Sequence, residues 1–173
     1  MLNPRSCFML NFHKVVLPGL NLPCHEVRFQ SFPCVRIIRP GEFSIGPHSD
    51  TSYGFGAAQI NFVVPLTASS DTASALFVES WPGAEDWHAV MGGYGTLKRF
   101  FGMLCLHFTS ENTTAETRAS LDFRVVPEPL WEAEHDQYTR RDGYYVRATR
   151  SPEGAWTRDD PLPAPDKRHG CPF

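Results

Sequence analysis

The stretch TRASLDFRVV, residues 117–126, alternates strictly between polar and apolar side chains. The apolar positions are Ala119, Leu121, Phe123 and Val125, and the polar positions are Arg118, Ser120, Asp122 and Arg124. Successive side chains of a β-strand point to opposite faces of the sheet, so this stretch predicts a strand with one buried face. The simplest interpretation of the other face is a solvated polar surface on an edge strand, and we expect this of Arg124 in particular.

Strand-like segments of the same kind fill the chain before this stretch. They span residues 25–30, 34–39, 46–50, 59–66, 75–80, 87–91, 96–101 and 103–108, with turn signals between them. Together with residues 118–126 they make roughly eight or nine short strands spaced about 10 residues apart, without an amphipathic helix among them. This pattern predicts an all-β antiparallel sandwich or barrel, and eight strands suit a double-sheet jelly roll.

The flanks of this region differ from it in composition. The predicted parts are an irregular N-terminal extension (1–24), a β core (25–127), a C-terminal extension that packs on the core (128–150) and a proline-rich tail (151–173). Pro18, Gly19 and Pro23 interrupt any periodicity in the first part. The third part predicts a short helix over 129–138 and a strand over 145–147. The charged, proline-rich tail is expected to be extended or poorly ordered.

The bulk properties favour one globular domain. A chain of 173 residues is long enough for one sizeable core. Its net charge of −3, without a basic run, gives no reason to expect nucleic acid or a membrane as a partner, and a small-molecule substrate is expected instead. The sequence shows no signal peptide or long apolar span, so we expect a cytoplasmic, intracellular protein. Five scattered cysteines favour reduced thiols over a disulfide framework or a zinc site. The oligomeric state is left open.

A histidine and an aspartate lie two residues apart in GPHSD, residues 46–50. On an extended segment the side chains at i and i+2 point to the same side, so His48 and Asp50 would converge on one point. One imidazole nitrogen and one carboxylate oxygen are part of a two-histidine, one-carboxylate site for non-haem Fe(II). The alternative is a hydrogen-bonded pair at the surface.

The second imidazole of such a site would have to come from elsewhere in the chain. Four of the other histidines lie at or beyond the borders of the strand region, and His88 has acidic neighbours that favour a surface position. His107, in the apolar segment MLCLHF, is the remaining candidate. A lone histidine in an apolar strand is more often a core residue than a ligand, so this choice depends on the next strand of the chain.

Arg118 and Ser120 lie on that next predicted strand, after His107, and share one face of it. A guanidinium with a neighbouring hydroxyl suits a carboxylate, because the guanidinium can bind both oxygens and the hydroxyl donates a further hydrogen bond. Arg124 would lie about 20 Å further along the strand than Arg118, too far to share one small ligand with it.

The order of these elements resembles that of the Fe(II)- and 2-oxoglutarate-dependent oxygenases: His-x-Asp, then a distal histidine, then Arg-x-Ser. The resemblance implies a double-stranded β-helix, a cupin-like jelly roll with short irregular or helical flanks. It also implies that His48, Asp50 and His107 bind Fe(II), and that Arg118 and Ser120 bind the distal carboxylate of 2-oxoglutarate.

The resemblance extends over about residues 25–127. The segments INFVVPLT (60–67), VES (78–80) and RASLDFR (118–124) are similar to a subgroup assigned to microbial secondary metabolism, including aminoglycoside pathways. The resemblance implies a dioxygenase that uses O2 and 2-oxoglutarate to oxidise, most simply to hydroxylate, an unactivated C–H bond of a small molecule. Succinate and CO2 would be released.

Three further polar residues lie near the predicted metal site. Asn61 is expected to contact the co-substrate, and Tyr53 and Gln59 to lie on the catalytic or substrate side, although each is equally typical of an ordinary hydrogen-bonded group. Two other functions stay open. A cupin-type metalloenzyme that does not use 2-oxoglutarate would not need Arg118 and Ser120, and a non-catalytic ligand-binding jelly roll would need neither the triad nor iron.

Overall fold

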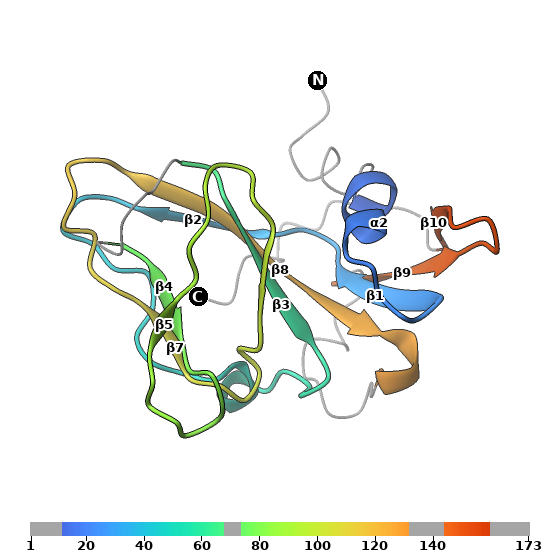
Figure 1. Cartoon of the computed structure of the whole chain (residues 1–173), viewed down its shortest axis with the longest axis horizontal. Helices are drawn as coiled ribbons and strands as arrows, with labels where there is room; N and C mark the ends of the chain where they lie inside the picture. Colours follow the sequence, from blue (N-terminus) through green and yellow to red (C-terminus); the bar gives the residue numbers. More distant parts are fainter. Residues whose placement is uncertain (1–11, 68–73, 132–143, 160–173) are drawn as a thin grey trace.

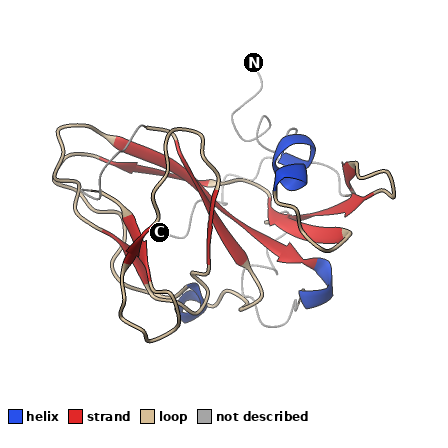
Figure 2. Ribbon diagram, viewed as in Figure 1, coloured by secondary structure: helices blue, strands red, loops and turns tan. Residues whose placement is uncertain are grey.

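The computed structural model describes residues 12–67, 74–131 and 144–159, and its regular structure is almost entirely β (Figures 1 and 2). The strands are β1 (Glu26–Gln30), β2 (Cys34–Ile38), β3 (Ile60–Pro65), β4 (Leu76–Val78), β5 (His88–Ala89), β6 (Lys98–Phe100), β7 (His107–Thr109), β8 (Arg118–Pro127), β9 (Tyr145–Arg150) and β10 (Trp156–Arg158). The helical segments are η1 (Phe12–Val16), α2 (Leu17–Gly19), η2 (Asp50–Tyr53) and η3 (Glu128–Leu130). The predicted all-β class is confirmed.

Strand β8 is the centre of the larger sheet, in which the order is β10-β9-β1-β8-β3-β6. On one side, the C-terminal part of β8 pairs with β1 and its N-terminal half pairs with β2. On the other side, residues 120–125 pair with β3. Neighbours on both sides make β8 an interior strand, so the edge-strand interpretation, preferred for Arg124, is wrong.

The smaller sheet has the order β5-β4-β7 and lies beside the part of the larger sheet that contains β2 and the N-terminal half of β8 (Figure 1). One cavity is lined from both sheets, by Leu76 of β4 and His107 of β7 and by Arg36 of β2 and Asn61 of β3. Two antiparallel sheets that enclose a common interior form the double-stranded β-helix, or jelly roll, that the sequence predicts.

The helical turns η1 and α2 pack on strand β1 of the larger sheet (Figure 1). The ring of Phe12 stacks on Phe29 with centroids 4.3 Å apart and meets Phe123 edge-on at 5.1 Å. Pro18 is expected to interrupt regular structure. It lies in the first turn of α2, where a proline is tolerated, and the helix forms around it. Residues 12–19 of the predicted irregular extension are therefore helical, whereas residues 21–24 are irregular as expected, and Phe12 and Leu17 belong to the core.

The C-terminal strands extend the larger sheet, because β9 pairs with β1 and β10 pairs with β9. Strand β9 confirms the strand predicted over 145–147. Residues 156–158, expected in an extended or poorly ordered tail, are extended and form the ordered strand β10, in which Trp156 is buried in the core. Of the helix predicted over 129–138, only the start is described, and residues 128–130 form a 3-10 turn. The remainder lies outside the described residues.

Cysteine chemistry differs from the expectation at one position. Cys24 and Cys105 have free thiols, whereas Cys34 takes part in a disulfide whose partner lies outside the described residues. The expectation that every thiol is reduced is therefore wrong for Cys34.

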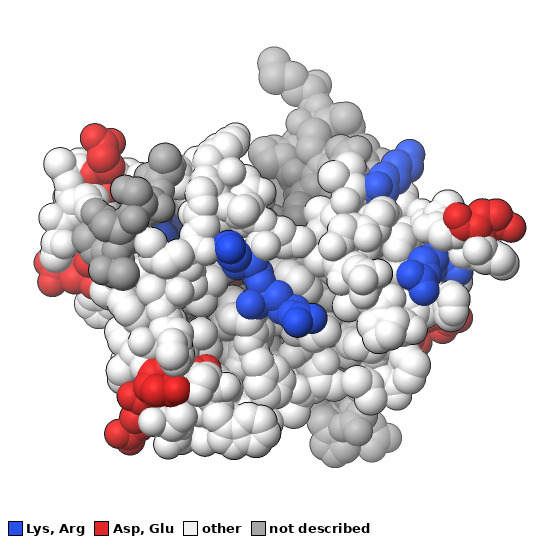
Figure 3. All heavy atoms as spheres, in the orientation of Figure 1, with Lys and Arg blue, Asp and Glu red and all other residues white. Residues whose placement is uncertain are grey.

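The surface carries charges of both signs. On the face shown in Figure 3, Lys and Arg form one cluster near the centre and separate patches towards the right, and Asp and Glu lie towards the margins. Within the three described ranges, none of the helices has the length and apolar character needed to cross a membrane.

Candidate metal centre

His48, Asp50 and His107 converge in the cavity between the sheets. His48 forms an isolated antiparallel bridge with His107, in which each backbone N–H donates to the other carbonyl, at 3.1 and 2.9 Å. Asp50 begins η2, and its backbone N–H donates to the carbonyl of Gly102 at 2.9 Å. Ser49 between them is extended, so both side chains turn to one side as the spacing predicts. The predicted strand itself is reduced to a single bridge.

The three side chains direct one ligand atom each to a common point. Nε2 of His48 lies 3.6 Å, and Nε2 of His107 lies 3.7 Å, from Oδ1 of Asp50. All three atoms lie within 4.8 Å of one another. Nδ1 of His48 contacts the carbonyl of Gly46 at 2.8 Å, and Nδ1 of His107 contacts that of Cys105 at 3.3 Å. A proton on each Nδ1, donated to these carbonyls, leaves the lone pair of Nε2 available for a metal. Backbone carbonyls fix the tautomer of metal-binding histidines in the same way in known metal sites.

Oδ1 of Asp50 is buried and has no hydrogen-bond donor in the described parts of the chain. A buried charged oxygen without a partner costs free energy, and a cation between this atom and the two Nε2 atoms would remove that cost. Two imidazoles and one hard oxygen suit a first-row divalent metal such as Fe(II). The residues present therefore fit the metal that the family resemblance implies.

The protonation states suit metal binding. Burial alone would raise the pKa of Asp50, but contact with His48 and the charges of Arg124 and His107 outweigh burial and hold this pKa well below its usual range. Burial lowers the pKa of His107 to about 4, against the opposing pull of Asp50. At neutral pH the carboxylate is ionised and His107 is neutral, which are the states that bind a metal.

The second oxygen of Asp50 is bound by the larger sheet. Nε of Arg124 donates to Oδ2 at 3.1 Å, Nη2 of Arg124 forms an ion pair with the same oxygen at 3.0 Å, and Nδ2 of Asn61 donates to it at 2.6 Å. Arg124 is only 7% exposed, so the expectation of a solvated side chain is wrong. Alternation along a strand cannot distinguish a polar face on water from one that lines an enclosed cavity. The available signal was that Arg124 shares the face of Arg118 and Ser120.

Gly102 and Phe100 support the site, and nothing in the sequence alone points to them. The N–H of Gly102 donates to Oδ1 of Asn61 at 3.1 Å. A Cβ at position 102 would lie 2.8 Å from Cε1 of His107 and 2.7 Å from the ring of Phe100. This loop can approach His107 so closely only because residue 102 has no side chain.

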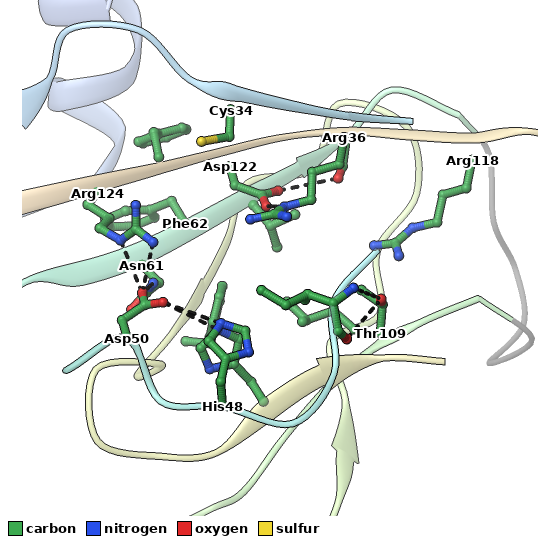
Figure 4. A pocket seen from close by; sticks show the side chains of 17 residues that line it. Cys34, Arg36, His48, Asp50, Asn61, Phe62, Thr109, Arg118, Asp122 and Arg124 are labelled. Atoms are coloured by element: carbon green, nitrogen blue, oxygen red, sulfur yellow. Dashed lines mark hydrogen bonds and ion pairs between the residues drawn. The ribbon is translucent and has the colours of Figure 1, made fainter. Parts of the chain in front are cut away.

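Arg118 and Ser120 line the same cavity. Figure 4 shows the guanidinium of Arg118 apart from His48 and Asp50. Nη1 of Arg118 donates to the carbonyl of Ser74 at 2.6 Å. The hydroxyl of Ser120 donates to Oδ1 of Asp122 at 3.3 Å, and Asp122 forms an ion pair with Arg36 of β2. The structure thus brings the predicted carboxylate-binding pair and the triad into one cavity.

The charged side chains of this cavity leave one guanidinium without a carboxylate. Arg124 pairs with Asp50 and Arg36 pairs with Asp122. Among the described residues, Arg118 has no carboxylate within ion-pair distance. Burial lowers the pKa of Arg118, yet an arginine stays protonated at any physiological pH. The cavity therefore carries an excess positive charge that suits an anion.

The three remaining predicted residues take different positions. Tyr53 is 37% exposed and packs edge-on against His48 with centroids 5.1 Å apart. Asn61 lines the cavity, but both ends of its amide are engaged as described above. Gln59 is buried, accepts a hydrogen bond from the hydroxyl of Tyr145 at 2.6 Å and does not line this cavity. The roles assigned to these residues stay predictions.

Fold and site together define a class: a double-stranded β-helix, or jelly-roll, protein with a candidate metal centre of two imidazoles and one carboxylate. No family model matches the chain. The sequence is 29% identical to the streptomycin biosynthesis protein StrG of Streptomyces griseus over 107 residues, which are 61% of this chain and 50% of StrG. The match thus spans half the length of that relative.

Solved structures with a similar fold include those of two non-heme enzymes. The non-heme monooxygenase ThoJ, in its nickel complex, is 15% identical with a TM-score of 0.48, over 59% of this chain and 45% of the ThoJ chain. SnoN, a non-heme alpha-ketoglutarate-dependent epimerase from nogalamycin biosynthesis, is 15% identical with a TM-score of 0.48, over 84% of this chain and 60% of the SnoN chain.

Proposed function

We propose that this protein is an Fe(II)- and 2-oxoglutarate-dependent dioxygenase that oxidises, most simply hydroxylates, an unactivated C–H bond of a small molecule. One observation carries the proposal: a single cavity contains the triad His48, Asp50 and His107 and also the guanidinium of Arg118, which has no carboxylate partner among the described residues. In Figure 4 this guanidinium lies apart from His48 and Asp50. The similarity to StrG, a streptomycin biosynthesis protein, supports a place in secondary metabolism.

A 2-oxo dicarboxylate matches both features of the cavity. Its 2-oxo acid end is a chelating ligand for a metal, and its distal carboxylate suits the guanidinium of Arg118 and the hydroxyl of Ser120. The arginines and aspartates of the cavity already sum to an excess of positive charge, to which a divalent metal would add. A dianion is therefore favoured over a neutral ligand.

The protein's own contribution to the reaction is positional. His48 and His107 would offer oriented Nε2 atoms and Asp50 an ionised oxygen, and three protein ligands leave three positions for other ligands. Bound iron would supply O2 activation coupled to conversion of 2-oxoglutarate to succinate and CO2. Tyr53, partly exposed beside His48, is the side chain we assign to the substrate side.

Anaerobic titration of the protein with Fe(II) and 2-oxoglutarate tests the proposal, because the chelate gives a weak visible charge-transfer band. We expect Arg118→Ala to retain Fe(II) but to lose affinity for 2-oxoglutarate by at least about 30-fold, since truncating one partner of a buried charged pair costs about 2 kcal/mol or more. Arg99→Ala, an exposed arginine on β6, is the matched control and should behave as the wild type.

Each alternative function predicts a different result of the same titration. Iron binding by the wild type without a band on addition of 2-oxoglutarate would favour a cupin-type metalloenzyme that uses another co-substrate. No iron binding at all would favour a non-catalytic ligand-binding jelly roll. Unchanged 2-oxoglutarate affinity in Arg118→Ala would show that the clamp assignment is wrong.

A further inference from the structure

The two oxygens of Asp50 have opposite surroundings. Oδ2 accepts one hydrogen bond from Nε of Arg124 and one from Asn61, and Nη2 of Arg124 forms an ion pair with it at 3.0 Å. Oδ1 accepts none in the described chain and faces the Nε2 atoms of both histidines. Figure 4 shows the same division, with Arg124 and Asn61 on one side of the carboxylate and His48 on the other. A carboxylate oxygen already in contact with three nitrogen atoms is poorly placed to bind a metal as well.

The donors to Oδ2 are themselves firmly fixed. Arg124 and Asn61 are direct partners in the register of β8 and β3, which is why both reach the same oxygen. The guanidinium of Arg124 lies 3.9 Å from the ring centroid of Phe55, and its side chain is buried. The amide oxygen of Asn61 is bound by the N–H of Gly102, which fixes the direction of its NH2 group. Asp50 therefore has little freedom to rotate.

We propose that Arg124, assisted by Asn61, is a positioning residue that restricts Asp50 to binding a metal through Oδ1 alone. The proposal rests on the metal site proposed above and adds a role for a residue outside that triad. A carboxylate that binds through one oxygen occupies one coordination position, whereas a chelating carboxylate occupies two. If Asp50 bound through both oxygens, only two coordination positions would remain. By preventing this, Arg124 keeps three positions open, two for a chelating ligand and one for a further ligand.

The pairing also has an electrostatic consequence. Arg124 compensates the charge of Asp50 inside the cavity, so a divalent metal held there would keep most of its own charge for an incoming anion. Two arginines of one strand then serve two different carboxylates: Arg124 binds that of the protein, and Arg118 is available to that of a ligand.

Cobalt(II) binding to the full chain, without 2-oxoglutarate, tests the role of Arg124. We expect Arg124→Gln to lower the Co(II) affinity by about 10- to 100-fold, the usual cost of losing an outer-shell partner. We also expect the visible spectrum per bound Co(II) to change, because the released carboxylate of Asp50 can rotate and bind through both oxygens. A merely structural role would reduce the amount of bound cobalt but leave the spectrum of the bound fraction unchanged.

Two further variants keep the test decisive. Arg124→Lys keeps the buried charge but cannot place two nitrogens of a rigid guanidinium on Oδ2, so its spectrum should also differ from wild type. Arg28→Gln is the matched control, because Arg28 also binds a carboxylate with two nitrogens, at 2.9 and 3.1 Å from Glu128, and also lies over an aromatic ring, Trp131. It should change neither affinity nor spectrum.

A wild-type spectrum per bound cobalt in Arg124→Gln, or full restoration by Arg124→Lys, would overturn the positioning role. These readings do not depend on 2-oxoglutarate, so they are separable from the proposed oxygenase activity. If that activity is wrong, the cobalt-loaded wild type will fail to bind 2-oxoglutarate while the effect of Arg124 on the spectrum persists.

Discussion

Single residues without metal-binding atoms decide how closely the parts of the triad approach. Gly102→Ala would place a Cβ 2.8 Å from His107 and 2.7 Å from Phe100, so one of these rings must move. We expect a loss of stability of about 1–3 kcal/mol, typical of overpacking, together with weaker Fe(II) or Co(II) binding. Thermal unfolding and metal titration measure both. Gly93→Ala, where no atom lies within 4 Å, is the control. Metal affinity equal to wild type in Gly102→Ala would show that this contact does not position His107.

At the scale of the elements, a buried carboxylate joins the turn after β4 to the segment before β7. Glu79 is 3% exposed and accepts backbone hydrogen bonds from Leu106 at 2.8 Å, Glu85 at 3.1 Å and Gly83 at 3.3 Å. The bond from Leu106 makes the largest contribution to lowering the pKa of Glu79, and burial opposes it. Because Leu106 precedes His107, this carboxylate also fixes the start of the strand that carries the distal histidine.

The lowered pKa gives the stability of this element a definite pH dependence. The unfolded chain binds a proton at Glu79 near the ordinary glutamate pKa of about 4.3, above the folded value. The stabilisation is therefore fully present at neutral pH and is lost as pH falls through the folded pKa. In urea denaturation, we expect Glu79→Gln to be less stable than wild type at pH 7 and the difference to shrink towards pH 3. Glu111→Gln, at an exposed position, should be as stable as the wild type at every pH. A difference in stability between Glu79→Gln and the wild type that does not change with pH would refute the role of the ionised Glu79 carboxylate.

Prediction from sequence succeeded for elements with a long alternating pattern and failed where partners decide the outcome. Strands β3 and β8 lie close to their predicted bounds. The segment before β7 also alternates, with Met103 and Cys105 buried and Leu104 and Leu106 exposed, yet it forms a turn because none of the described strands pairs with it. The order of the motifs was enough to predict that His48, Asp50 and His107 lie together. The buried contact of Arg124 with Asp50 depends on tertiary packing, which the order of motifs does not reveal.

At the scale of the whole molecule, the site exists only because the two sheets close on one cavity. His107 comes from the smaller sheet, Arg118 and Arg124 from the larger one, and His48 and Asp50 from the connection between β2 and β3. A metal bound by all three ligands would therefore link both sheets, and a ligand between the metal and Arg118 would fill the space that they enclose.

A crystal structure of the full chain, prepared without oxygen and with Fe(II) and 2-oxoglutarate, tests this account most directly. We expect one anomalous iron peak, with the iron bound by Nε2 of His48, Nε2 of His107 and Oδ1 of Asp50. We also expect the distal carboxylate of 2-oxoglutarate on the guanidinium of Arg118. Iron bound at other residues, or 2-oxoglutarate absent from the cavity while iron occupies the triad, would contradict this expectation.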